Sequence, residues 1–212
     1  MSKTKIAIQG ELGAYSHIAA ENLYPGIEIK TCITFEETFK QAYNDSNFKI
    51  VIPIENSLAG RVADIHYLLP KYKLQIHGEY FQPVEHNLLC KPEASIDDIK
   101  FIRSHAQAIG QCQNIINKNK FKSIISADTA GSAKDLAEGE DKSIAAIASE
   151  LSAKIYNLKI LKKNIEDEKG NVTRFLIMGK NVEQPEFIKN KKFITSCIFR
   201  VKSEPSALYK CL

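Results

Sequence analysis

The feature of this 212-residue sequence that most restricts its fold is a regular alternation of short apolar segments with segments of helical periodicity. The first apolar segment covers residues 5–9, and a helical pattern follows from Ser16 to Leu23. The same order recurs, with further strands predicted at 27–33, 50–52, 100–103, 122–126 and 143–147, each followed by a predicted helix. Alternating strands and helices are typical of α/β proteins with largely parallel sheets. We therefore expect an α/β fold.

Two longer extended segments interrupt this alternation. Residues 74–90 contain only Gly78 and Pro83 as breaks, and residues 173–178 are extended again after the second series of helices. We interpret both segments as crossings between two lobes with a cleft between them. The expected division gives lobe 1 about residues 1–78 plus 166–180, lobe 2 about residues 79–165, and a linker at residues 181–192.

Composition and charge exclude several classes of protein. Hydrophobic residues make up 44% of the chain and charged residues 25%, which is ordinary for a globular protein. The net charge is only +4, and the lysines lack interleaved aromatic residues, so we expect no nucleic-acid partner. Five scattered cysteines without a C-x-x-C pair indicate a reducing compartment. With neither a signal-peptide core nor a membrane-length apolar run in the sequence, we expect a cytoplasmic protein without a membrane partner.

The motif at residues 53–60, Pro-Ile-Glu-Asn-Ser-Leu-Ala-Gly, is the most informative one. It lies between a predicted strand and a predicted helix, and it places Glu55, Asn56 and Ser57 in consecutive positions. Ligands of α/β sheets bind at this end of a strand, and the N–H groups of a helix N-terminus favour anions. A plain helix cap would need only Asn56 or Ser57. The additional carboxylate of Glu55 therefore favours a ligand site.

Three other junctions between a strand and a helix carry small or polar side chains. They supply Ser16, Ser104, Gln107, Thr129 and Ala130. Each junction alone has a structural explanation, such as a turn, a hydrogen-bonding His105 or an N-cap at Asp128. Together they present neutral donors to one cleft, which suits a small ligand with more than one negative charge. Because the sequence shows no metal-ligand spacing and no phosphate-binding loop, we expect no metal and no cofactor.

Residues 171–175, Asn-Val-Thr-Arg-Phe, complete the set. Arg174 offers a planar fork for a carboxylate, and Thr173 offers a hydroxyl that can donate a proton or a hydrogen bond at neutral pH. Standing alone, these residues would be interpreted as part of a strand with an exposed arginine.

The motifs within residues 10–16, 53–60, 104–107, 127–133, 145–149 and 171–175, in this order, closely resemble prephenate dehydratase. The resemblance covers about residues 5–178 and is most specific in Pro-Ile-Glu-Asn-Ser and Thr-Arg-Phe. It implies that residues 1–180 form a catalytic domain with two lobes similar to type II periplasmic binding proteins. The implied activity is that of a hydro-lyase, which converts prephenate to phenylpyruvate with loss of carbon dioxide and water in phenylalanine biosynthesis. We further expect a homo-oligomer, either a dimer or a tetramer.

The resemblance also implies roles for individual residues. Thr173 would donate to the leaving hydroxyl, directly or through a water, and Glu55 would be the ultimate acid if burial raises its pKa. Arg174 would hold a substrate carboxylate. The remaining substrate-binding residues would be Ser16, Asn56, Ser57, Ser104, Gln107, Thr129, Ala130 and Phe175.

Residues 193–212 resemble the start of an ACT domain, which in this family binds phenylalanine as a feedback inhibitor. The motif at residues 202–208 departs from the usual Glu-Ser-Arg-Pro-Gly-Ala-Leu at Lys202, Glu204 and Ser206. One strand and a short helix cannot bury a core, so we expect an incomplete ACT-like segment and no phenylalanine inhibition. The main alternative function is a non-catalytic, cleft-closing binder or sensor of a small organic anion or an aromatic amino acid. The intact Thr-Arg-Phe motif argues against a degenerate sensor. A transport binder should carry a signal peptide and a gene regulator a DNA-binding helix pair, and the sequence shows neither.

Overall fold

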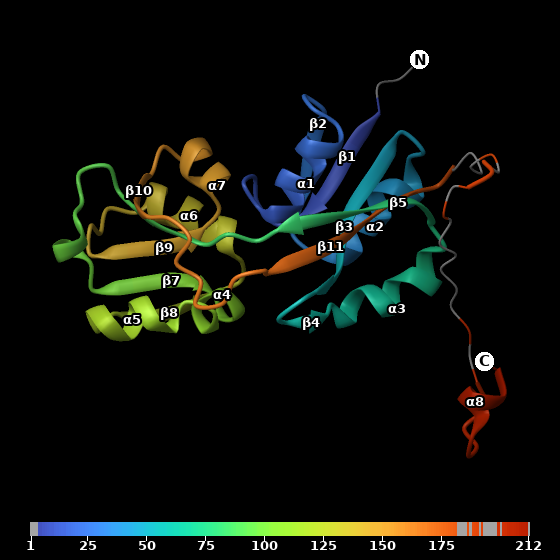
Figure 1. The fold of residues 1–212 in the computed structure, drawn as a ribbon. Helices are drawn as coiled ribbons and strands as arrows, with labels where there is room; N and C mark the ends of the chain where they lie inside the picture. The colour runs from blue at the N-terminus through green and yellow to red at the C-terminus, as the bar shows by residue number, and fades with distance from the viewer. Residues whose placement is uncertain are drawn as a thin grey trace. The chain divides into compact units, whose positions relative to one another are not determined.

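The computed structural model describes residues 4–181, 186, 188–190, 192, 199 and 201–211, which fall into two compact units divided after residue 182. The first unit holds two sheets with their helices (Figure 1). In the second unit the helix α8 (Ala207–Cys211) is described. The strand expected at residues 193–201 falls mostly outside the described residues.

The first sheet has the strand order β2–β1–β3–β11–β5. Its strands are β1 (Lys5–Gln9), β2 (Glu28–Cys32), β3 (Phe48–Asn56), β5 (Gln75–Pro83) and β11 (Val172–Gly179), with the short β4 (Gly60–Arg61) paired to the end of β3. Strand β1 runs parallel to β2 and β3, whereas β11 runs antiparallel to both β3 and β5. The expectation of largely parallel sheets is therefore wrong, because β11 enters the middle of this sheet from the second lobe.

Helices cover the two faces of this sheet. Helix α1 (Tyr15–Leu23) packs on the face that carries Phe175 and Ile177. Helices α2 (Phe35–Asn44) and α3 (Ala63–Tyr72) pack on the opposite face, which carries Leu176 and Met178. Proline usually ends a helix, and we expected the helix after residues 53–60 to stop at Pro70. This expectation is wrong, since Pro70 lies within α3 and the helix is capped by Lys73 in a left-handed conformation (φ 49°).

The second sheet has the order β10–β6–β9–β7–β8 and is also mixed. Its strands are β6 (Asn87–Cys90), β7 (Phe101–His105), β8 (Lys122–Ser126), β9 (Ile144–Ala148) and β10 (Lys159–Lys162). Its helices are the 3₁₀ helix η1 (Ile96–Asp98), α4 (Ala106–Gly110), α5 (Gln113–Asn119), α6 (Thr129–Glu138) and α7 (Glu150–Ile155). From the sequence we expected the helix after the strand at 100–103 to run unbroken over residues 106–118. It is broken at Cys112, whose backbone (φ −126°, ψ 30°) is not helical.

Two stretches of chain connect the sheets. The first runs through residues 84–86 and the second through residues 163–171. Strand β5 pairs with β11 as far as Pro83, so the first crossing lies later than the expected boundary near residue 78. The two-lobed α/β architecture is confirmed, with a separate apolar core on each face of each sheet.

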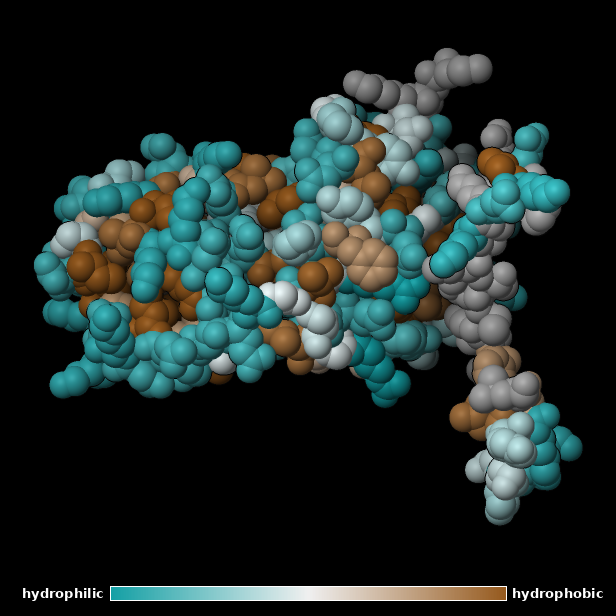
Figure 2. Space-filling model, in the orientation of Figure 1, coloured by the Kyte–Doolittle hydropathy of each residue, from teal (hydrophilic) through white to brown (hydrophobic). Residues whose placement is uncertain are grey.

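The surface of the first unit mixes hydrophilic and apolar residues. Figure 2 shows apolar side chains scattered among hydrophilic ones over both lobes. Folded proteins ordinarily expose much apolar surface, so this pattern by itself marks no docking site. No helix within the described part of the chain is long and apolar enough to cross a membrane.

Candidate active site

The predicted site residues of the first lobe lie where β3 and β11 pair. Thr173 lies opposite Asn56, and Arg174 lies opposite Glu55. Successive side chains of a strand point to opposite faces of a sheet. Thr173 and Asn56 therefore lie on the face that α1 covers, and Arg174 and Glu55 lie on the other face. The sequence placed Thr173 and Arg174 side by side, but they cannot present their side chains to a ligand from the same face.

The amide of Asn56 is oriented by the turn that follows β3. Its Oδ1 accepts the backbone N–H groups of Leu58 (3.0 Å) and Ala59 (2.8 Å). Its Nδ2 must then donate, and it lies 2.9 Å from Thr173 Oγ1 and 2.6 Å from Asn171 Oδ1. Because the Thr173 hydroxyl accepts this bond, its own proton remains available for a ligand.

Asn56 does not cap a helix. Strand β3 continues through Asn56, and a tight turn leads to β4 before α3 begins. The N-cap of α3 is Val62, which makes no side-chain capping bond. The polar run at residues 55–57 thus ends a strand of a hairpin, and the expected strand-to-helix junction is displaced to Val62. Ser57 also contacts the second crossing, since its Oγ donates to the Gly170 carbonyl (3.2 Å) and accepts the Val172 N–H (2.9 Å).

A chain of hydrogen bonds extends from Asn56 into the second lobe. Asn171 Nδ2 donates to Gln111 Oε1 (2.8 Å), which also lies 3.0 Å from His86 Nε2. His86 Nδ1 lies 3.2 Å from the Tyr15 hydroxyl, which donates to the Glu85 carbonyl (2.6 Å). Because Gln111 Oε1 is an acceptor, the contact with His86 assigns the imidazole proton to Nε2. The single Tyr15 proton is given to the Glu85 carbonyl, so Tyr15 and His86 Nδ1 are neighbours without a donated bond.

The two ionisable side chains in this series of hydrogen bonds, His86 and Tyr15, are neutral at pH 7. Burial lowers the pKa of His86, and burial raises the pKa of Tyr15 well above its ordinary value. Asn171 belongs to the predicted motif at residues 171–175 but was assigned no role, and Gln111 and His86 were not predicted as members of the site. The available signal at His86 was a run of three polar residues, Glu85 to Asn87, between the apolar Val84 and Leu88 of an extended segment.

Arg174 is engaged by two carboxylates. Its Nε and Nη2 lie 2.7 and 2.6 Å from Glu79 Oε2, and its Nη1 lies 3.3 Å from Glu55 Oε1. The guanidinium also lies over the Phe81 ring, 5.9 Å from its centroid. Burial opposes the charge of Arg174, but hydrogen bonds with Glu79 and Glu55 outweigh it and raise its pKa. The Glu55 side chain is 54% exposed, so the burial on which its expected role as an acid depended is not present.

Four predicted substrate contacts are buried in the structure. Ser16 Oγ donates to the Gln9 carbonyl (3.3 Å), and Ser104 Oγ donates to the Ile147 carbonyl (2.7 Å). Ala130 has no exposed surface, and Phe175 packs in the apolar cluster under α1. In this arrangement these side chains serve the packing and pairing of the strands, with 0–6% of their surface exposed against 9% for Thr173.

Gln107 and Thr129 remain accessible at the first turns of α4 and α6. The first turn of α6 is capped by Asp128, which accepts the Gly131 N–H (2.6 Å). Among the described residues, no hydrogen bond joins Gln107 or Thr129 to the Thr173–Asn56 pair. The structure thus places these two residues on the second lobe without a contact to the first-lobe residues.

The loop before α1 holds the two lobes together. The Gly13 carbonyl accepts the hydroxyls of Ser149 (2.6 Å) and Ser152 (3.1 Å), and the Leu12 carbonyl accepts the Tyr156 hydroxyl (3.0 Å). Gly13 has φ +91°, a conformation that other residues rarely adopt. The Gly10–Ser16 motif therefore forms an interlobe contact.

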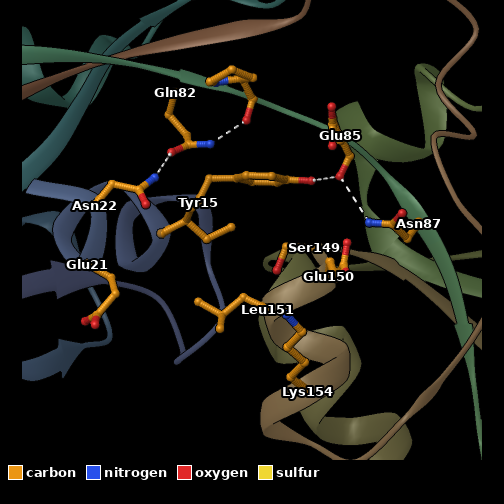
Figure 3. Close-up of a pocket in the computed structure, with 12 residues that line it drawn as sticks. Tyr15, Glu21, Asn22, Gln82, Glu85, Asn87, Ser149, Glu150, Leu151 and Lys154 are labelled. Atoms are coloured by element: carbon orange, nitrogen blue, oxygen red, sulfur yellow. Dashed lines mark hydrogen bonds between the residues drawn. The ribbon is translucent and has the colours of Figure 1, made fainter. Parts of the chain in front are cut away.

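A cavity of about 330 Å³ lies between α1, α7 and the first crossing. Figure 3 shows Tyr15 reaching from α1 towards Glu85, with Gln82 above it and Lys154 of α7 on another side. None of the predicted site residues lines this cavity, although Gln82 is the strand partner of Thr173. No group of three or more His, Cys, Asp or Glu side chains in the described part of the chain is arranged to hold a metal.

The fold and the site define a two-lobed α/β protein with a polar cluster at the crossing between its lobes. Comparison with known proteins is specific, because residues 6–183 match the family described as prephenate dehydratase. The chain belongs to the prephenate dehydratase family.

Individual relatives agree with this assignment. The chain is 40% identical over 209 residues to a bifunctional N-acyl-homoserine lactone acylase/prephenate dehydratase from Komagataeibacter europaeus, covering 98% of this chain and 73% of the relative. It is 39% identical to arogenate dehydratase/prephenate dehydratase 2, chloroplastic, from Arabidopsis thaliana, covering all of this chain and 55% of the relative. The solved prephenate dehydratase from Arthrobacter aurescens in complex with L-Phe superposes with a TM-score of 0.79 at 26% identity, covering 87% of this chain and 63% of that one.

Proposed function

We propose that this chain converts prephenate to phenylpyruvate, with loss of carbon dioxide and water, in phenylalanine biosynthesis. The observation that carries the proposal is the hydrogen bond from Asn56 Nδ2 to Thr173 Oγ1, which joins the two most specific family motifs. In the same proposal residues 1–180 are the catalytic domain, residues 181–192 a linker and residues 193–212 an ACT-like segment. The protein would act in the cytoplasm as a homo-oligomer.

Thr173 would assist the departure of the ring hydroxyl. Breaking the carboxylate C–C bond releases carbon dioxide, and its electron pair forms the aromatic ring as hydroxide leaves. Aromatisation supplies the driving force, so the enzyme needs to orient the dianion and supply a proton to the leaving oxygen. General acid catalysis of this kind contributes about 10²–10⁴-fold. The Thr173 proton is suited to this role because Asn56 bonds to the oxygen and leaves that proton unused. A proton from solvent would then restore the Thr173 hydroxyl, so the step consumes one proton overall and releases water.

The substrate carboxylates would meet neutral donors. Gln107 and Thr129 are the accessible predicted residues at helix N-termini of the second lobe, where N–H groups favour anions. The polar chain through Asn171 and Gln111 would hold the crossing near Thr173 in place.

The test is turnover of prephenate by the purified chain, followed as phenylpyruvate absorbance. Thr173→Ala should lower kcat by about 10²-fold or more, and Thr173→Ser should recover part of the rate. Thr31→Val, on the exposed strand β2, is the matched control and should retain the wild-type kcat. Near-full kcat in Thr173→Ala would show that Thr173 is not the donor.

The same preparation distinguishes the alternatives. Saturable binding of prephenate by calorimetry without phenylpyruvate formation would identify a binder or sensor. Because relatives bear the names arogenate dehydratase and N-acyl-homoserine lactone acylase, both arogenate and an N-acyl-homoserine lactone belong in the assay. A kcat/KM higher for either than for prephenate would replace the proposed substrate.

A further inference from the structure

We infer that Glu79 is a positioning residue of the active site, which acts through Arg174 to hold Thr173 opposite Asn56. Arg174 then serves as a clamp between strands, and not as a ligand for a substrate carboxylate. The inference rests on the proposed function and specifies what Arg174 of the Thr-Arg-Phe motif does within this chain.

The Arg174 side chain joins three adjacent strands. Strand β11 carries Arg174 between β5, which carries Glu79, and β3, which carries Glu55. Glu79 Oε2 receives both Nε (2.7 Å) and Nη2 (2.6 Å), while Glu55 Oε1 is the more distant partner at 3.3 Å. Glu79 is also the better shielded carboxylate, with 29% of its side chain exposed against 54% for Glu55. Glu79 is thus the stronger anchor of the arginine.

Strand β11 needs such an anchor because its pairing is irregular on both sides. The register with β3 shifts between Arg174 and Phe175, and the register with β5 shifts between Ile177 and Met178. A slip of one residue would turn Thr173 to the opposite face of the sheet. Since Arg174 adjoins Thr173, a clamp at Arg174 fixes the face of the sheet on which the Thr173 hydroxyl lies and its position along the strand. Misplacement of a reacting group by about 1 Å can lower a rate about 10²-fold.

Arg174 is badly placed to bind the substrate that Thr173 would protonate. The two side chains lie on opposite faces of the sheet, and the arginine side chain is only 25% exposed. A substrate carboxylate would have to displace Glu79 from two of the arginine nitrogens and to enter beside the Phe81 ring.

The experiment compares Glu79→Gln, Arg174→Lys and the double variant with wild type in prephenate turnover. A positioning role predicts that each single variant lowers kcat about tenfold or more and keeps KM within about twofold of the wild-type value. It also predicts that the kcat of the double variant is no lower than that of the worse single variant. Glu28→Gln is the matched control, since it removes a carboxylate paired with Lys5 (2.6 Å) on the far strands of the same sheet. It should retain the wild-type kcat.

Two kinetic outcomes would overturn the inference. Arg174→Lys with raised KM and unchanged kcat, together with lowered KM in Glu79→Gln, would show that Arg174 binds substrate and that Glu79 competes with it. A lowered thermal midpoint with unchanged kcat in Glu79→Gln would reduce Glu79 to a purely structural residue.

A second measurement keeps the test independent of turnover. In hydrogen–deuterium exchange, the amides of residues 172–175 should exchange at least about threefold faster in Glu79→Gln than in Glu28→Gln. Unchanged exchange there would overturn the inference. Absence of prephenate turnover by the wild type, with the exchange difference present, would instead refute the proposed function and leave the Glu79 clamp demonstrated.

Discussion

Replacing Gly13 with alanine should destabilise the protein by more than the backbone conformation alone would cost. An added Cβ would lie 2.4 Å from Ser152 Oγ and 2.8 Å from Ser152 Cα. The Oγ belongs to a side chain that can rotate, but the Cα is part of helix α7 and can move only with the helix. The substitution therefore pushes the two lobes apart at the contact that the Gly13 carbonyl makes with Ser149.

The size of the effect has two parts. A left-handed backbone costs a non-glycine residue about 1–2 kcal/mol. Overpacking against a well-packed neighbour adds about 1–3 kcal/mol, so the sum is about 2–5 kcal/mol. At about 2–4 °C for each kcal/mol in a domain of this size, the thermal midpoint should fall by about 4–20 °C.

Gly26→Ala separates the two parts. Gly26 also has a positive φ, +70°, but its added Cβ would meet nothing within 4 Å. The Gly26→Ala variant should therefore show the backbone cost alone, which corresponds to a fall in thermal midpoint of about 2–8 °C. Thermal unfolding of both variants, followed by circular dichroism, gives the comparison. Equal midpoints for the two variants would refute the view that Gly13 is packed rigidly between the lobes.

Three further predictions concern protonation, thiols and metals. Because burial lowers the pKa of His86, stability should be fully present above about pH 6.5 and fall as the pH drops through the lowered folded-state value. The fall in thermal midpoint from pH 7.5 to 5.5 should be smaller in His86→Gln than in the wild type. An equal fall in both would assign the effect to other groups such as His17 and His77, whose pKa burial also lowers. Of the described cysteines, the exposed Cys211 should react with a thiol reagent in the native protein. The others are buried and burial raises their pKa, so they should react only on unfolding: Cys32, Cys90 and Cys112. Rapid labelling of Cys112 in the native protein would contradict its packing. Dialysis against EDTA should leave the rate of prephenate turnover unchanged, and a loss restored by a divalent cation would show a metal site.

Local patterns predicted the individual elements well. Strands β1 and β8 begin and end at the predicted residues 5–9 and 122–126, and Asp128 accepts an N-terminal N–H group of α6 as a helix cap does. These features depend on residues within a few positions of one another. Expectations failed where a distant segment intervened, as when β11 enters the middle of the first sheet and makes it mixed.

In the candidate site, too, local features could be predicted from the sequence and contacts between distant segments could not. The sequence by itself determined the α/β class, the family and the motifs that contain Thr173 and Asn56, because motif spacing and strand periodicity are properties of neighbouring residues. Only the tertiary structure decided which side chains meet. Asn56 reaches Thr173 across 117 residues of sequence, and Glu79 reaches Arg174 across 95. Such pairs form when strands align in one register, and the energy that selects that register comes from the packing of both faces of the sheet, which local sequence patterns do not specify.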